Sequence, residues 1–159
     1  MTTHTIVLAL GLAATAPAFA ADPCAIPAAA PARAADLSGP VVAVVDGDTV
    51  DIRSHGKTVR VRLYGIDAPE HQNTAGLLAR AALERLADGK DLACAIVDQD
   101  RYKRTVAACR IAGGPDLSLA QLATGNAATY RRYLKQEPFR AVYIAAEDKA
   151  RAAHCGIWR

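Results

Sequence analysis

Three short strand-like segments follow one another closely, and they constrain the fold of this chain more than any other feature. Residues 41–46 form an apolar run, and residues 48–53 and 57–64 alternate polar with apolar side chains at the two-residue period of a half-buried strand. The turn-forming sequences Asp46-Gly47 and Ser54-His55-Gly56 separate these segments. The stretch therefore predicts three consecutive strands joined by tight turns.

The rest of the chain predicts further strands and helices around these three. Ala79, Leu83 and Leu86 share one face of a helical pattern that begins after Asn73 and stops at Gly89. In full, helices are predicted over 73–87, from Asp116 or Ser118 to Gly125, and over 139–154, and further strands over 91–98 and 105–112. Five strands with about three helices predict a mainly β (α+β) domain built on a small Greek-key barrel.

The first residues of the chain have the features of an export signal. Residues 6–14 are apolar but too few to span a bilayer, and Ala18-Phe19-Ala20 matches the small-x-small pattern of a cleavage site. We expect residues 1–20 to be a signal peptide, residues 21–39 an arm rich in alanine and proline, and residues 40–159 one domain. The alternative is an uncleaved membrane anchor. Cleavage would leave a periplasmic or secreted protein without stable membrane association.

Four cysteines follow the expected cleavage point, namely Cys24, Cys94, Cys109 and Cys155. An even number in an exported chain favours disulfides, and no Cys-x-x-Cys pair suggests a zinc site. Four cysteines allow three pairings. In a hairpin of the strands 91–98 and 105–112, one antiparallel register places Cys94 opposite Cys109, which favours that bond together with Cys24–Cys155.

Acidic and cationic side chains lie near the predicted strand ends. Asp48 follows the first turn, Asp67 and Glu70 follow the third strand, Arg62 lies within that strand, and Arg104 precedes the fifth. Converging carboxylates bind a hard cation, a carboxylate can accept a proton from an attacking water, and arginine recognises phosphate. These residue types predict a metal-assisted phosphodiester hydrolase. The formal net charge of +3 permits a polyanionic partner without identifying one.

Four strings of sequence resemble the thermonuclease family, the staphylococcal-nuclease-like enzymes. Residues 45–50 read Val-Asp-Gly-Asp-Thr-Val, and residues 61–70 read Val-Arg-Leu-Tyr-Gly-Ile-Asp-Ala-Pro-Glu. Residues 100–107 read Asp-Arg-Tyr-Lys-Arg-Thr-Val-Ala, and residues 152–158 read Ala-Ala-His-Cys-Gly-Ile-Trp. The strings occur in the order typical of the family, and the resemblance covers residues 41–158.

The resemblance implies a five-stranded OB-type barrel with three helices and a calcium-dependent nuclease that acts on DNA and RNA. In the family, the positions matching Asp48 and Asp67 bind calcium through their carboxylates, and the position matching Ala68 binds it through a main-chain carbonyl. Ala68 stands where the best-known member has threonine, a difference that leaves a main-chain ligand intact. Products ending in 3′-phosphate are expected.

The resemblance also implies which residues carry the chemistry. Glu70 matches the residue that activates the attacking water, and Arg62 and Arg104 match those that bind the phosphate and its developing charge. The protein is expected to act as a monomer on nucleic acid. The alternative is a non-catalytic OB-fold module that binds single strands, but such a module could lose the carboxylates that this chain retains.

The charged loop before the fifth strand is expected to contact the substrate through Arg101, Tyr102 and Lys103. Lys103 stands where the family has glycine, so a position that requires positive φ would strain the lysine, which could instead add a phosphate contact. The tyrosines of the family's nucleotide pocket correspond to the region of Tyr130 and Tyr133. The cations between and after these tyrosines are interpreted as a solvated basic face. They are Arg131, Arg132 and Lys135.

Overall fold

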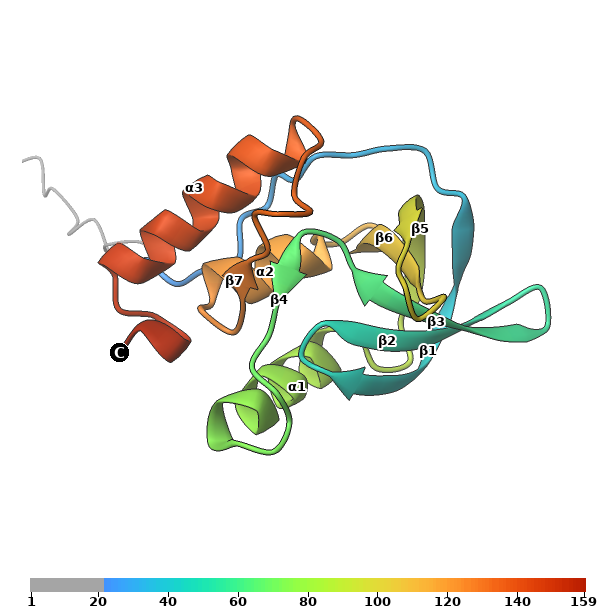
Figure 1. Ribbon diagram of the computed structural model, residues 1–159, viewed down its shortest axis with the longest axis horizontal. Helices are drawn as coiled ribbons and strands as arrows, with labels where there is room; N and C mark the ends of the chain where they lie inside the picture. Colours follow the sequence, from blue (N-terminus) through green and yellow to red (C-terminus); the bar gives the residue numbers. More distant parts are fainter. Residues whose placement is uncertain (1–21) are drawn as a thin grey trace, which may run out of the picture.

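The computed structural model describes residues 22–159, so the expected signal peptide lies outside the described residues. The elements are, in chain order, β1 (Leu37–Asp46), β2 (Thr49–Ser54), β3 (Lys57–Leu63), β4 (Ile66–Asp67), α1 (Thr74–Ala87), β5 (Asp91–Gln99), β6 (Thr105–Ile111), α2 (Leu117–Ala123), β7 (Ala128–Thr129), α3 (Phe139–Ala152) and the short 3₁₀ helix η1 (Gly156–Trp158). Each predicted strand and helix corresponds to one of them (Figure 1). The two-residue strands β4 and β7 and the helix η1 were not predicted.

The five long strands close into a barrel in the order β1-β2-β3-β6-β5. Neighbouring strands are antiparallel except for β3 and β6, which pair in parallel from Val61↔Thr105 to Leu63↔Ala107. The closed barrel with three helices confirms the predicted α+β, OB-type fold. A closed barrel leaves few free strand edges, and the short parallel pairing leaves part of β3 with one free edge among the described residues.

Strand β1 begins at Leu37, earlier than the predicted residue 41, because its first residues pair with β5 rather than β2. Residues 37–40 pair with β5, and from Val41 onwards the strand pairs with β2. Gly39 lies at the change of partner, where a Cβ atom would stand 1.9 Å from the main-chain oxygen of Arg53. A Gly-Pro sequence is typical of a loop, so sequence reasoning began the strand too late in the chain.

The core fills the barrel and continues between the barrel and the helices. Alternate residues of the strands point inward and are almost fully buried, namely Val50, Ile52, Val61, Leu63, Leu92, Cys94, Ala107 and Cys109. Helix α1 contacts β1 and α2, while α2 packs on α3 beside the barrel (Figure 1). The buried Tyr143 of α3 donates its hydroxyl to Asp116, the N-cap of α2, at 2.9 Å. The described residues contain no helix with the length and apolar character needed to cross a membrane.

Two disulfides confirm the favoured cysteine pairing. Cys94 and Cys109 lie opposite each other in the β5–β6 ladder, with their Cα atoms 4.0 Å apart. Cys24 is bonded to Cys155, next to η1, with a Cα–Cα distance of 5.9 Å. The second bond fixes the N-terminal arm near the end of α3, and Figure 1 shows the arm running from there over the molecule to β1.

Candidate active site

The turn between β1 and β2 holds Asp48 in a fixed place. Gly47 occupies the turn because a Cβ atom there would lie 2.7 Å from the Cβ atoms of both Ala68 and Ala79. The side-chain amide of the buried Gln121 donates to the carbonyl oxygens of Gly47 and Ala79 at 2.7 and 3.0 Å. These contacts fix the turn between α1 and α2, so the backbone that carries the Asp48 side chain is held in one position.

The carboxylate of Asp48 is buried and joins this turn to the segment after β3. Its Oδ2 atom accepts the N–H of Ala68 at 2.9 Å and lies 2.9 Å from Nη2 of Arg62, and its Oδ1 atom accepts the hydroxyl of Thr49 at 3.0 Å. Burial raises the pKa of Asp48 to about 7, and the nearby Arg62 guanidinium opposes that shift only in part. A buried carboxylate with a raised pKa is short of compensating positive charge.

Arg62 brings two of the predicted acidic residues together. Its Nη2 atom lies 2.9 Å from Oδ2 of Asp48 and 2.7 Å from Oδ1 of Asp67, and it also donates to the carbonyl of Ile66 at 3.3 Å. The Arg62 side chain is 19% exposed, whereas that of Asp67 is 60% exposed. The pair of carboxylates therefore extends from the barrel interior to solvent, with one guanidinium between them.

Glu70 lies outside this cluster. It is exposed in the turn that leads from β4 to α1, where its main-chain oxygen accepts the N–H of Asn73 at 3.2 Å. Within residues 22–159, the ion pairs of Arg62 are formed with Asp48 and Asp67, not with Glu70. Gly76 of α1 allows the turn to pack closely, because a Cβ atom there would lie 1.9 Å from the main-chain oxygen of Glu70.

The loop of residues 100–104 holds the second arginine. Asp100 accepts the main-chain N–H groups of Tyr102 and Arg104 through Oδ1, both at 2.9 Å, and the Nε–H of Arg104 through Oδ2 at 2.7 Å. Burial acts to raise the pKa of Asp100, but these hydrogen bonds outweigh it and hold that pKa below its usual range. Arg101 and Arg104 both lie over the Tyr102 ring, at 4.7 and 5.6 Å from its centroid. Lys103 has a φ of 64°, so the position does have the left-handed backbone considered from the sequence.

Strand β7 and the residues that follow it lie beside the cluster around Arg62. The short strands β4 and β7 pair at Ile66↔Thr129 and Asp67↔Ala128. Buried Tyr64 holds the residues that follow, because its hydroxyl oxygen accepts the main-chain N–H groups of Lys135 and Gln136 at 2.9 and 3.0 Å. The chain after β7 is thereby fixed beside the cluster around Arg62.

These segments enclose a pocket of about 450 Å³, a volume within the range of small-ligand sites. Its lining includes five residues predicted from the sequence, namely Arg62, Asp67, Arg101, Tyr102 and Arg104. Asp48 and Ala68 are not among the lining residues; Asp48 contacts Arg62 of the lining, and Ala68 contacts Asp48 through its main-chain N–H. The lining does not include Glu70 or Lys103.

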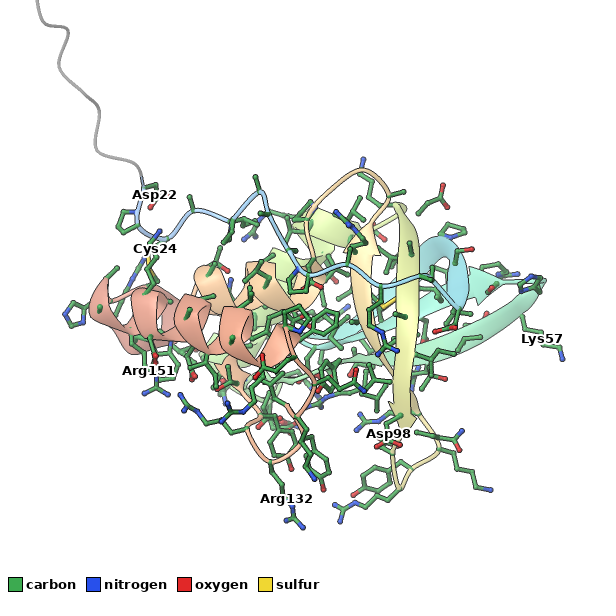
Figure 2. All side chains as sticks on the ribbon, turned by 90° about the horizontal axis from the view of Figure 1, so that it is seen from above. Asp22, Cys24, Lys57, Asp98, Arg132 and Arg151 are labelled. Carbon is green, nitrogen blue, oxygen red and sulfur yellow. A yellow bond between two sulfur atoms is a disulfide. The ribbon has the colours of Figure 1, made fainter. Side chains whose placement is uncertain are left out.

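The pocket also includes residues for which the sequence gave no firm role. Tyr130 and Tyr133 line it with their rings in edge-to-face contact, 4.8 Å between centroids, and both are about half exposed. Arg132, interpreted from the sequence as part of a solvated face, lines it as well, and Figure 2 shows Arg132 and Asp98 on the same side of the molecule. The interleaving of tyrosine and arginine in residues 130–133 is the signal that could have identified this wall.

The oxygen atoms near Arg62 are suited to a hard cation. Carboxylate and carbonyl oxygens are the ligands of calcium, and carboxylate oxygens of Asp48 and Asp67 both lie within 2.9 Å of the same nitrogen of Arg62. Residues 22–159 contain no group of three or more His, Cys, Asp or Glu residues placed to hold a metal ion. Two carboxylates are fewer ligands than calcium takes, so a cation bound here would need further oxygen ligands, water among them.

Comparison with known proteins gives the same family as the motifs. Residues 60–159 match the family model described as staphylococcal nuclease homologue. The chain is 35% identical over 132 residues to a protein named micrococcal nuclease from Shigella flexneri, covering 78% of this chain and 75% of that protein. It is 31% identical over 128 residues to a protein named uncharacterized endonuclease from Escherichia coli O157:H7, covering 80% of this chain and 81% of that protein. The chain therefore belongs to the staphylococcal nuclease homologue family.

Proposed function

We propose that this protein is an exported, calcium-dependent nuclease that hydrolyses phosphodiester bonds of DNA, with RNA as a second substrate. The observation that carries the proposal is the placement of Arg62 between Asp48 and Asp67 at a pocket whose other wall holds Arg104 and tyrosines. Family membership and the names of the nuclease relatives support it.

Two arginines bind the scissile phosphate in this proposal. Arg62 and Arg104 line the same pocket but come from β3 and from the loop before β6. Arg62 is held by two carboxylates and Arg104 by that of Asp100, so each guanidinium is oriented before substrate arrives. Guanidinium groups form paired hydrogen bonds with phosphate oxygens and stabilise the negative charge that develops as the bond breaks.

Calcium is the proposed cofactor, held by the carboxylates of Asp48 and Asp67 and by the main-chain carbonyl of Ala68. The raised pKa of buried Asp48 supports this assignment, because a cation beside it would restore the charge balance that Arg62 alone leaves incomplete. When bound, calcium would polarise a phosphoryl oxygen as a Lewis acid.

Glu70 is the proposed general base. It is exposed, and it lies one short turn beyond Asp67, so water can reach its carboxylate. A carboxylate in this place would take a proton from the attacking water. Catalytic contacts in an enzyme without its substrate are often longer than in the working complex, so the distance of Glu70 from the pocket lining is compatible with this role.

Exposed aromatic rings beside the arginines favour a single-stranded substrate. Tyr102 and Tyr133 are 65% and 51% exposed and stand at the same pocket, where an unstacked base can lie against a ring. Arg101 lies over Tyr102 and supplies further positive charge for the phosphate backbone. Lys103 adds one more cation next to Arg104.

Export of the protein remains part of this proposal. Both disulfides support an oxidising compartment, because such bonds are rare where thiols are kept reduced. Residues 1–20 would be removed, leaving the arm of residues 21–39 and the domain of residues 40–159. Mass spectrometry of the protein isolated from its host would give the mature N-terminus. A chain that retains residues 1–20 would contradict cleavage.

One assay tests the enzymatic proposal. Purified oxidised protein is incubated with single-stranded DNA in calcium and then with a chelator, and cleavage is expected only with calcium. Glu70→Gln should lower the rate about 100-fold or more, whereas the matched variant Glu84→Gln on α1 should cleave at the wild-type rate. A folded protein that binds the strand without cutting it would favour the non-catalytic OB-fold module.

A further inference from the structure

Helix α3 carries a carboxylate on its buried side. Glu147 is 1% exposed and shares that side with apolar and aromatic residues, namely Phe139, Tyr143, Ala146 and Ala150. A glutamate is seldom buried so completely unless it is paired, because removing a charged group from water costs free energy. The partners of Glu147 therefore indicate what the buried carboxylate does.

Glu147 joins α3 to the segment that contains β7. Its Oε2 atom accepts the hydroxyl of Thr129, the last residue of β7, and Nη2 of Arg131 at 3.4 Å. Its Oε1 atom accepts Nη2 of Arg151, one turn further along α3, at 2.9 Å. Burial acts to raise the pKa of Glu147, but the hydrogen bonds from Thr129 and Arg151 outweigh it and hold that pKa below its usual range. One charged carboxylate thus binds the chain on both sides of Tyr130.

Strand β7 in turn holds the short strand that carries Asp67. Among the described residues, β7 is the only partner strand of β4. Asp67 lies opposite Ala128 in this pair, and the main-chain N–H of Tyr130 donates to the carbonyl of Gly65 at 2.8 Å. Both Asp67 and Tyr130 line the pocket, and the Asp67 carboxylate binds Arg62 there. A continuous path of contacts therefore leads from α3 through β7 to two residues of the pocket.

We propose that Glu147 is a positioning residue of the active site, which binds Thr129, fixes β7 against β4 and so sets the place of the Asp67 carboxylate and of Tyr130. The pocket lining includes neither Glu147 nor Thr129, so Glu147 acts on the site through β7 and not by touching substrate. This inference rests on the proposed function, in which Asp67 binds calcium. Groups that hold a metal ligand in place commonly change metal affinity by roughly 10- to 100-fold when they are removed.

Variants at Thr129 test the contact without removing the buried charge. Thr129→Val keeps the shape of the side chain but loses the hydroxyl that Glu147 binds, and Thr129→Ser keeps that hydroxyl. Calcium binding is measured without DNA by isothermal titration calorimetry. Thr129→Val should weaken it about tenfold, and Thr129→Ser should bind nearly as wild type does. Glu147→Ala should weaken it at least as much, and adding Thr129→Val to Glu147→Ala should cause no further loss, because the same contact is already absent.

A control at the far hairpin separates misplacement of the site from lost stability. The buried Ser54 shares a hydrogen bond of 3.2 Å with Nδ1 of His55 at the end of β2. Figure 2 shows Lys57 of this hairpin at the end of the molecule opposite Arg151 of α3. Ser54→Ala should lower the urea midpoint, as Thr129→Val does, and leave calcium binding unchanged. An equal loss of calcium affinity in Ser54→Ala would overturn the inference.

Amide hydrogen exchange at Tyr130 reports the pairing of β7 with β4 independently of calcium and of cleavage. The Tyr130 N–H should exchange about fivefold faster in Thr129→Val than in wild type, and at the wild-type rate in Ser54→Ala. Wild-type calcium affinity in Thr129→Val would overturn the inference and leave the nuclease proposal standing. If the wild-type protein binds no calcium, the proposed function loses its cofactor, and exchange at Tyr130 decides the role of Glu147: faster exchange in Thr129→Val supports it, and an unchanged rate overturns it.

Discussion

The buried carboxylate of Asp116 allows a quantitative test of how burial affects the pKa of a side chain and the stability of the protein. It caps α2, and its Oδ1 atom accepts both the N–H of Leu119 at 2.8 Å and the hydroxyl of Tyr143 at 2.9 Å. Burial raises the pKa of Asp116 to about 6 from an ordinary 3.8, in spite of these hydrogen bonds and of nearby Arg110. Asp116→Asn keeps the accepting oxygen and a good N-cap but removes the charge.

The sign and size of the effect follow from this shift. The folded protein binds a proton at Asp116 more tightly than the unfolded chain does, so the free energy of unfolding falls as the pH rises from about 4 to about 6 and is then constant. A shift of about 2 units corresponds to roughly 3 kcal/mol. The difference in free energy of unfolding between Asp116→Asn and wild type should therefore change by about 3 kcal/mol in favour of the variant as the pH rises from 4 to 7.

Urea unfolding of both proteins across this pH range measures the difference, in which the other titrating groups cancel. Asp51→Asn is the control, because the Arg60 fork lowers the pKa of Asp51, and the stability from that pair is lost only as the pH falls below about 4. Its difference from wild type should be constant from pH 4 to pH 7. A constant difference for Asp116→Asn as well would refute the reasoning.

Three further predictions test the site and the covalent links. Arg104→Ala should lower kcat/KM on single-stranded DNA about 100-fold, and Arg80→Ala, at an exposed ion pair of α1, should not; equal rates would remove the proposed role. Calcium should raise the Tm of the wild-type protein and not that of Asp67→Asn, as scanning calorimetry would show; equal shifts would place the ion elsewhere. Replacing Cys94 and Cys109 together by serine should lower the free energy of unfolding by roughly 3 kcal/mol, since the bond closes a loop of 15 residues; an unchanged denaturation midpoint would contradict this.

The local sequence pattern was sufficient to predict much of the barrel. The alternation in β2 and β3 and the turn residues between them fix which side chains face inward, because a strand presents successive residues to opposite faces. The same logic gave the register that joins Cys94 to Cys109. The candidate site residues came from motifs, and the structure brings Arg62 together with Asp48 and Asp67.

Other features needed contacts between distant segments. The alternation of β3 predicts Tyr64 on the polar face with Arg62, yet Tyr64 is buried against Phe139 of α3, and its hydroxyl accepts the main-chain N–H groups of residues 135 and 136. That contact fixes the segment with Tyr133 beside the pocket, and nothing in the local pattern of either segment encodes it. Strands as short as β4 and β7 carry no periodicity to detect.

The amino-acid sequence by itself determined the five long strands, the three α-helices and the types of residue available for chemistry, and it favoured the cysteine pairing, because these depend on periodicity and on chemical identity. Tertiary structure decided which of those residues share one pocket and how burial raises the pKa of Asp48. The physical reason is that exposure, electrostatic environment and cavity shape are set by residues far away in the chain, which meet only after the barrel has closed.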